Sequence, residues 1–324
     1  MVVLRTPLCD LLGIDVPVLC APFGPWDEVE LAAAVCEAGG LGALGTAVRS
    51  VPELEAQWRR LRELTGKPFA INHTIRPFDE DAFEATLRFA PAAISFHIGV
   101  LPDLVARAHD AGILWIQQVI DRGQAERALE AGADVIVAQG GEAGGHGGWV
   151  GTMVIVPEVV DVAGDVPVVA AGGIADGRGL AAALALGAQG ALVGTRLLAS
   201  EEMGVNAAWK QCIVEAGALD AVKIPHSERV LPPYNRPGGP ADPRALRTPL
   251  IDRLGDDPEG VDPKTVGPEL LQALREDRAH EYIPYAGQSA ALVHDVRPAA
   301  DIVRELVEGA EAALERALSA RAAS

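Results

Sequence analysis

The chain has 324 residues and a formal net charge of −18 at pH 7. A chain of this length can bury a large core, and a composition rich in Ala, Val, Leu and Gly with 4% aromatic residues is typical of an α/β protein. The negative charge argues against nucleic acid or an anionic membrane as a partner.

Other broad classes are also disfavoured. Apolar runs are too short for a transmembrane helix, and the N-terminus lacks a basic segment followed by a clean apolar run. The four cysteines are scattered without zinc or CxxC spacing, so reduced thiols are favoured over disulfides. These features together predict a cytoplasmic protein.

Strand-like runs alternate with helix-like runs over the first 200 residues. Eight strands are expected at Pro17–Ala21, Leu41–Leu44, Phe69–Asn72, Ala92–His97, Ile113–Val119, Asp134–Ala138, Pro167–Ala171 and Gly190–Val193. Helices are expected between them at Glu28–Ala38, Val51–Thr65, Asp79–Phe89, Pro102–Ala111, Arg122–Ala131 and Val154–Val162, with a further one from the cap Asp176 to Leu186. This alternation predicts a parallel sheet closed into a (β/α)8 barrel, with an open doubly wound sheet as the alternative.

The alternation of strand-like and helix-like runs ends near residue 200. A helix is expected at Asn206–Glu215, and the segment 224–267 is then crowded with proline, glycine and charge, as in a lid or an interface arm. Helices at Pro268–Ala279 and Ala299–Leu318 follow. We therefore expect three parts: a barrel core at 1–220, an irregular insertion or lid with a short helix at 221–290, and a C-terminal helix at 291–324 that packs on the barrel.

The stretch Val135–Gly148, VIVAQGGEAGGHGG, runs from a buried strand into a loop in which six of ten residues are glycine. Glycine lets the backbone lie close against a flat ligand. His146 is the side chain of this loop whose unperturbed pKa lies near neutrality. Glu142 could orient the loop by accepting backbone hydrogen bonds. The alternative is a flexible surface turn with an incidental histidine.

Glycine turns also follow the last two expected strands. Gly172 and Gly173 come after the seventh strand, and Gly194 and Thr195 after the eighth. In a barrel these are the two loops that typically hold phosphate, because their backbone N–H groups can point at one anion. Tight turns that need glycine only for geometry are the alternative, but two such turns on successive strands favour phosphate.

A phosphate held there usually belongs to a cofactor whose ring crosses the mouth of the barrel. The residues at the other strand ends are mostly small or neutral hydrogen-bonding groups, which suit an isoalloxazine ring: Ala21, Pro22, Phe23, Gly24, Asn72, His97, Gln118 and Gln139. His97 could equally be a core histidine. No cluster has three ligands of metal type, so no metal is expected.

Three segments, LCAPFGP, AQGGEAGGHGG and AAGGIADGRGLAAALALGAQGALVGTRLLASEE, resemble the nitronate monooxygenase family, formerly called 2-nitropropane dioxygenases. The resemblance covers roughly residues 5–215 and again AGQSA at 286–290. It implies an FMN-dependent (β/α)8 barrel in which His146 is the active-site histidine. The expected cofactor residues are Ala21, Pro22, Phe23, Asn72, Gln118, Gln139, Gly144, Gly145, Ala171, Gly172, Gly173, Gly194 and Thr195.

The sequence departs from the family pattern in two places, which weakens any inference about its substrate. Phe23 stands where a methionine is common, and the segment 224–267 matches nothing that we can align. The resemblance implies oxidation of an alkyl nitronate, or of a nitroalkane, with O₂ to a carbonyl compound and nitrite, with His146 as the base or as a charged donor.

Other functions and partners remain open. The same barrel resembles FMN-dependent enoyl-ACP reductases and NAD(P)H:quinone reductases, so reduction of quinones or enoyl thioesters is the alternative. A non-enzymatic flavin- or phosphate-binding barrel is a third reading. The expected partners are a small-molecule substrate and O₂, and a homodimer is possible.

Overall fold

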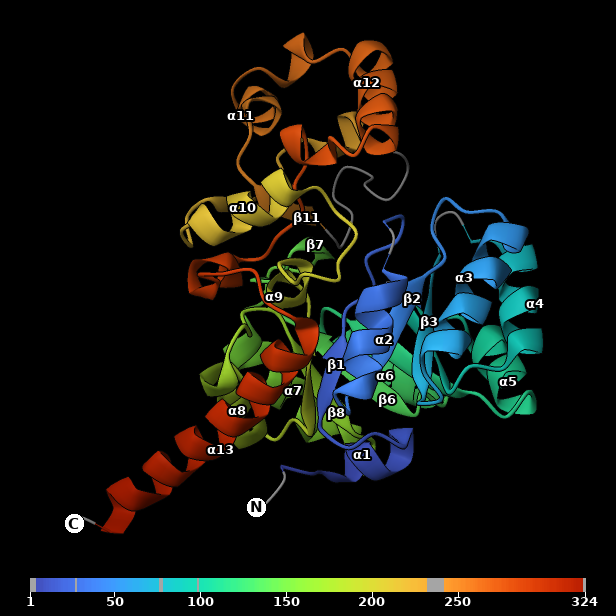
Figure 1. Cartoon of the computed structure of the whole chain (residues 1–324), viewed down its shortest axis with the longest axis vertical. Helices are drawn as coiled ribbons and strands as arrows, with labels where there is room; N and C mark the ends of the chain where they lie inside the picture. Colours follow the sequence, from blue (N-terminus) through green and yellow to red (C-terminus); the bar gives the residue numbers. More distant parts are fainter. Residues whose placement is uncertain (1–3, 27, 76–77, 98, 232–241, 323–324) are drawn as a thin grey trace.

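The computed structural model describes residues 4–26, 28–75, 78–97, 99–231 and 242–322 (Figure 1). Its main body is an eight-stranded parallel sheet in the order β1-β9-β8-β6-β5-β4-β3-β2. The strands are β1 (Val18–Cys20), β2 (Gly42–Gly45), β3 (Phe69–Thr74), β4 (Ala93–His97), β5 (Leu114–Val119), β6 (Val135–Gln139), β8 (Val168–Ala171) and β9 (Gly190–Val193). A parallel bridge between Leu19 and Leu41 joins the two ends of the sheet. The expected (β/α)8 barrel is confirmed.

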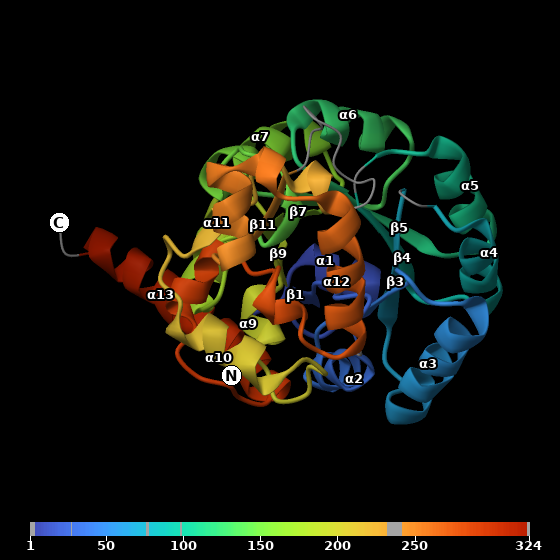
Figure 2. The ribbon, with the colours of Figure 1, turned by 90° about the horizontal axis from the view of Figure 1, so that it is seen from above.

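Helices cover the outside of the barrel and follow one another around the strands (Figure 2). They are α2 (Val29–Glu37), α3 (Val51–Leu64), α4 (Glu80–Phe89), α5 (Pro102–Asp110), α6 (Arg122–Glu130), α7 (Thr152–Ala163) and α8 (Gly177–Ala185). Side chains set several of their N-termini: Asp79 accepts from Ala82 N and Asp121 accepts from Gln124 N. Because such caps are local signals, the sequence located these helices to within a few residues.

A short helix that was not among the expected elements closes one end of the barrel. Helix α1 (Pro7–Leu12) places Leu8 and Leu12 in the same buried cluster as interior residues such as Leu19 and Val169. A Cβ on Gly190 would lie 2.7 Å from Leu8 Cδ2, so the helix packs directly against the strand. A ligand must therefore enter at the opposite, carboxyl end.

The segment after the barrel is more regular than expected. It contains α10 (Ala207–Glu215), β10 (Ala221–Lys223), β11 (Asp242–Leu246), α11 (Pro249–Asp256) and α12 (Pro263–Arg275). The expected bounds Pro268–Ala279 were wrong, because Asp262 caps a helix that begins at Pro263 and tolerates Pro268 inside it. Residues 232–241 of the expected excursion lie outside the described residues, and the division at 220 and 290 stays a prediction.

The glycine-rich loop pairs with this segment. Residues Gly145–Gly147 form a short strand, β7, in a three-stranded antiparallel sheet of order β10-β11-β7. His146 lies opposite Pro243 in the register. The loop is therefore part of a sheet, in contrast to the flexible surface turn that was the alternative.

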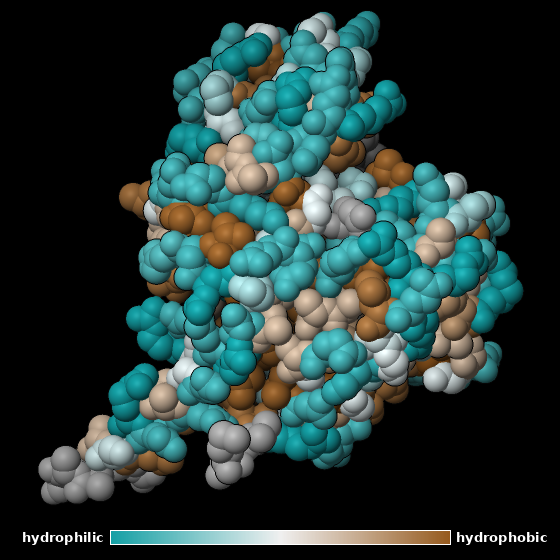
Figure 3. Space-filling model, in the orientation of Figure 1, coloured by the Kyte–Doolittle hydropathy of each residue, from teal (hydrophilic) through white to brown (hydrophobic). Residues whose placement is uncertain are grey.

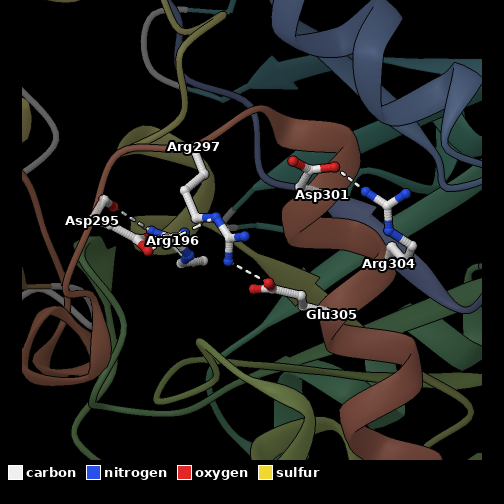
Figure 4. A network of polar contacts seen from close by, with 6 residues as sticks. All are labelled: Arg196, Asp295, Arg297, Asp301, Arg304 and Glu305. Atoms are coloured by element: carbon white, nitrogen blue, oxygen red, sulfur yellow. Dashed lines mark hydrogen bonds and ion pairs between the residues drawn. The ribbon is translucent and has the colours of Figure 1, made fainter.

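The last helix, α13 (Ala299–Ala322), packs on α8 and extends beyond the barrel (Figure 1). Gly177 and Gly309 bring the two helices into backbone contact, because a Cβ on Gly177 would lie 2.2 Å from Gly309 C. The segment before α13 is tied to α9 (Thr195–Leu198) by Arg196, which donates to Asp295 O and Oδ1 at 2.7 Å each (Figure 4). Arg196 therefore links α9 to the segment that precedes α13.

The hydropathy of the surface is consistent with a highly charged chain. The face seen in Figure 3 is mostly hydrophilic, with apolar residues in small groups. None of the described helices is long and apolar enough to cross a bilayer.

Candidate active site

A cavity of about 600 Å³ lies at the carboxyl ends of the strands. His146 and all the expected cofactor residues line it. They come from successive loops and strand ends: Ala21, Pro22 and Phe23 after β1, Asn72 in β3, Gln118 in β5, Gln139 in β6, Gly144 and Gly145 in the glycine loop, Ala171, Gly172 and Gly173 at the end of β8, and Gly194 and Thr195 after β9. The structure thus brings together residues that the sequence placed on separate strands, while their individual roles stay predictions.

The two glycine turns after β8 and β9 offer unused backbone donors. The N–H groups of Gly172, Gly173, Gly194 and Thr195 donate no hydrogen bond to any described residue. Gly172 has φ +94°, and a Cβ there would lie 2.9 Å from Gly140 O, so the turn leaves no room for a side chain. Unpaired N–H groups beside a cavity are suited to an anion. These turns therefore fit the phosphate of a flavin mononucleotide.

The amide side chains of the cavity wall fit an uncharged ring with carbonyls and ring nitrogens. Asn72 Nδ2 donates to Ser95 Oγ at 3.0 Å, which fixes the side chain, and its Oδ1 accepts no hydrogen bond from the described residues. Gln139 Nε2 donates to His146 O at 3.1 Å, and its buried Oε1 is likewise unpaired within the described chain. Gln118 also lines the wall. The two acceptor atoms are available to ring N–H groups.

Close backbone contacts fix the loop that carries His146. A Cβ on Gly144 would lie 2.5 Å from Ala286 C, and a Cβ on Gly287 would lie 2.6 Å from Glu142 O. Only glycine allows this approach. The AGQSA segment thus packs directly on the loop, and the Tyr285 ring lies 6.2 Å from the His146 ring.

Glu142 and Arg244 hold the same loop from outside the cavity. Glu142 accepts from Thr152 N at 2.9 Å and from Thr152 Oγ1 at 2.9 Å, at the start of α7. Arg244 is buried and donates to Gly141 O at 2.8 Å and to Ala221 O at 2.6 Å. Both contacts fit an orienting role, which the sequence suggested for Glu142.

Burial keeps the histidines near the cavity neutral. The pKa of His146 is lowered to about 4, mainly by burial and further by the positive charge of Lys223. The pKa of His97, which also lines the cavity, is lowered to about 3, chiefly by burial. His73 lies outside the cavity wall in contact with Thr86 Oγ1 at 2.9 Å, so it is a core histidine.

An aromatic group that no sequence motif indicated lines the cavity. The rings of Trp26 and Trp209 meet edge to face with centroids 4.9 Å apart, and Tyr285 lies 6.3 Å from Trp26. These residues belong to a loop after β1, to α10 and to the segment before AGQSA. No motif connects them, so only the fold reveals the group.

The charge of the cavity wall contrasts with that of the chain. The described lining residues contain no Asp, Glu or Lys, and their one arginine is Arg127 of α6. Arg127 is exposed and forms no ion pair with the described residues. An acid-free wall in a chain of net charge −18 is suited to anionic ligands. Within the described ranges no group of three or more His, Cys, Asp or Glu side chains could hold a metal ion.

Comparisons with known proteins place this site in context. A family model described as Nitronate monooxygenase matches residues 5–85 and 76–309. The chain is 32% identical over 370 residues to a nitronate monooxygenase of Paraburkholderia phytofirmans, covering 96% of this chain and 97% of the relative.

The chain is also similar to two proteins that are not named nitronate monooxygenases. The chain is 38% identical over 254 residues to the "(3aS,4S,5R,7aS)-5-hydroxy-7a-methyl-1-oxo-octahydro-1H-indene-4-carboxyl-CoA dehydrogenase" of Mycobacterium tuberculosis, and the match covers 78% of this chain and 68% of that relative. The structure of FabK from Thermotoga maritima superposes with a TM-score of 0.86 at 32% identity, covering 97% of this chain and 99% of the other.

Proposed function

The chain belongs to the nitronate monooxygenase family of flavin-dependent oxidoreductases, and from this premise we propose that it binds FMN and oxidises alkyl nitronates with O₂ to a carbonyl compound and nitrite. A pair of nitronate anions and a single O₂ balance a pair of carbonyl compounds and a pair of nitrite ions. The observation that carries the proposal is one cavity that joins the unused N–H groups of the two glycine turns, the amide wall and His146.

Each part of the cavity has a separate task in this proposal. The N–H groups of Gly172, Gly173, Gly194 and Thr195 hold the phosphate, and Asn72, Gln118 and Gln139 meet the ring. When bound, FMN supplies the redox chemistry that takes electrons from the nitronate and passes them to O₂. The aromatic group of the cavity wall packs on the alkyl part of the substrate and excludes water.

His146 manages the proton when a neutral nitroalkane binds. With a pKa of about 4 the imidazole is neutral at neutral pH, so it is able to accept the proton next to the nitro group. The nitronate formed is an anion beside the new imidazolium, and this opposite charge stabilises the proton on His146. The base and the charged donor are therefore successive states of one residue.

The experiment compares wild type with His146→Ala on two forms of one substrate. General-base catalysis contributes about 10²–10⁴-fold, so we expect nitroalkane turnover to fall by about that factor. Turnover of the pre-formed nitronate should fall much less, because no proton has to be removed. His109→Ala is the matched control, since His109 pairs with Asp134 on the surface.

Two outcomes would refute the proposal. If His146→Ala matched wild type on the nitroalkane, the base role would be wrong. If the folded protein were colourless and did not take up added FMN, the cofactor assignment would be wrong.

A second function is favoured by the aromatic and arginine residues of the cavity wall and by the relatives. The aromatic group and the exposed Arg127 suit a larger substrate with an apolar body and an anionic tail, such as an acyl thioester. The similarity to a carboxyl-CoA dehydrogenase points the same way. Anaerobic mixing separates the two: rapid bleaching of the flavin by NADH or NADPH supports a reductase of thioesters or quinones, whereas bleaching by a nitronate alone supports the monooxygenase.

A further inference from the structure

The strand that carries His146 is short and sits at the edge of its sheet. Its pairing partner at His146 is Pro243, which has no backbone N–H to donate. The carbonyl of His146 is bonded instead by Gln139 Nε2. A three-residue, glycine-rich edge strand is weak on its own, so its position must depend on side chains.

Lys223 provides that support. It lies on β10, two strands away, and its Nζ donates to Gly147 O at 2.8 Å and to Asp242 O at 2.7 Å. Gly147 and Asp242 face each other in the register of β7 and β11. The ammonium group therefore joins the ends of both strands at the residue next to His146, and the Trp149 ring packs on it at 5.5 Å.

The charge of Asp242 acts on this ammonium group without forming an ion pair with it. Neither Lys223 nor its neighbour Arg244 forms an ion pair with a described carboxylate. The carboxylate of Asp242 accepts from Trp149 Nε1 at 2.8 Å instead. The other groups near His146 are His97 on β4 and Tyr285 before AGQSA. Positive charge on the insertion thus faces the imidazole.

We propose that Lys223 is a positioning residue for His146: its ammonium group fixes the strand that carries the imidazole and places a positive charge near it before substrate binds. This proposal rests on the base role of His146 in the proposed function. It assigns a task in the reaction to the insertion, because a residue of the 221–290 segment prepares the histidine of the barrel loop.

The directions of the pKa shifts of His146 and Lys223 agree with this geometry. Burial is the main cause of the low pKa of His146, the charge of Lys223 lowers it further, and Asp242 opposes them. Burial, and then the charge of Arg244, lowers the pKa of Lys223 to about 8. Lys223 therefore stays charged over the range in which His146 would otherwise gain its proton.

The test measures the protonation of His146 directly in the flavin-loaded enzyme, by NMR titration of isotope-labelled histidine. The resonance is identified by its absence in His146→Gln. We expect Lys223→Gln, which keeps a donor but removes the charge, to raise the pKa of His146 by about one unit. Lys223→Arg, which keeps the charge, should leave that pKa near its wild-type value.

Two further variants keep the result interpretable. Asp242→Asn removes a negative charge and should move the pKa of His146 in the opposite direction, downwards, which tests whether charges on the insertion act on the imidazole. Lys210→Gln is the matched control, because Lys210 is a buried lysine that donates to Glu201 O at 3.2 Å on another element. It should leave the titration of His146 unchanged.

Turnover of the nitroalkane gives a second readout. In Lys223→Gln the acidic limb of the pH profile of kcat/KM should move upwards together with the NMR titration, and Lys223→Arg should restore it. An unchanged titration of His146 in a folded Lys223→Gln would overturn the proposal; if that variant does not fold, an unchanged titration in Asp242→Asn would overturn it. If the titration moved but His146→Ala kept full activity, the positioning would stand and the base role would fall.

Discussion

Replacing Gly172 by alanine tests whether the turn after β8 holds the flavin phosphate. Gly172 has φ +94°, a conformation that costs an alanine about 1–2 kcal/mol. The new Cβ would lie 2.9 Å from Gly140 O and 3.1 Å from Ala143 N, so backbone must move to relieve the contact. Overpacking of this kind costs a further ~1–3 kcal/mol.

The displacement should weaken FMN binding as well as the fold. A hydrogen bond to a charged group is worth about 1.5–3 kcal/mol, so misplacing one N–H donor raises the Kd for FMN by about 10- to 100-fold. The assay is quenching of FMN fluorescence on titration with apoprotein, with thermal unfolding measured in parallel on the same samples.

Gly112→Ala is the control for backbone strain alone. Gly112 has φ +73° in a turn after α5, and nothing lies within 4 Å of a Cβ there. It should lower Tm by about 1–3 °C, from the same strain, and leave the Kd for FMN unchanged. Equal FMN affinity in wild type and Gly172→Ala would refute the assignment of this turn to the phosphate.

Two further predictions concern acid stability and substrate charge. Burial holds the pKa of His73 at about 4, against 6.5 when exposed, so the unfolded state takes up the proton first and the free energy of unfolding falls as pH falls through this window. His73→Gln should remove about 2 kcal/mol of the loss between neutral pH and about pH 5, measured by urea unfolding at both; an unchanged slope would contradict the burial argument. Arg127→Gln should raise KM about two- to five-fold for a nitronate with a distal carboxylate. It should change neither KM for a neutral nitroalkane nor the value of kcat. Equal effects on KM for both substrates would exclude a contact between Arg127 and the anionic group.

Much of this protein could be predicted from local sequence patterns. Strand and helix periods, caps such as Asp79 and the glycine turns after β8 and β9 are set by residues close together in the chain. Because the carboxyl ends of barrel strands converge, those patterns also predicted which side chains would share one cavity. A homodimer and a cytoplasmic location stay predictions from composition and resemblance.

The neighbours of His146 could not be found in this way. Strand β7 is three residues with two glycines, and neither glycine favours a strand, so no propensity signalled its pairing with β11. Lys223 reaches Gly147 across 76 residues of sequence, and Trp26 meets Trp209 from opposite ends of the barrel segment. Helix α1 likewise closes the barrel without a periodic pattern long enough to notice.

The sequence by itself therefore determined the barrel, its two glycine turns and the histidine at the sixth strand end, since each depends on backbone conformation over a few residues. Only the tertiary structure decided which charges and rings surround that histidine, and hence its low pKa. Burial and electrostatic fields depend on distances in space, which long-range packing sets and local composition does not record.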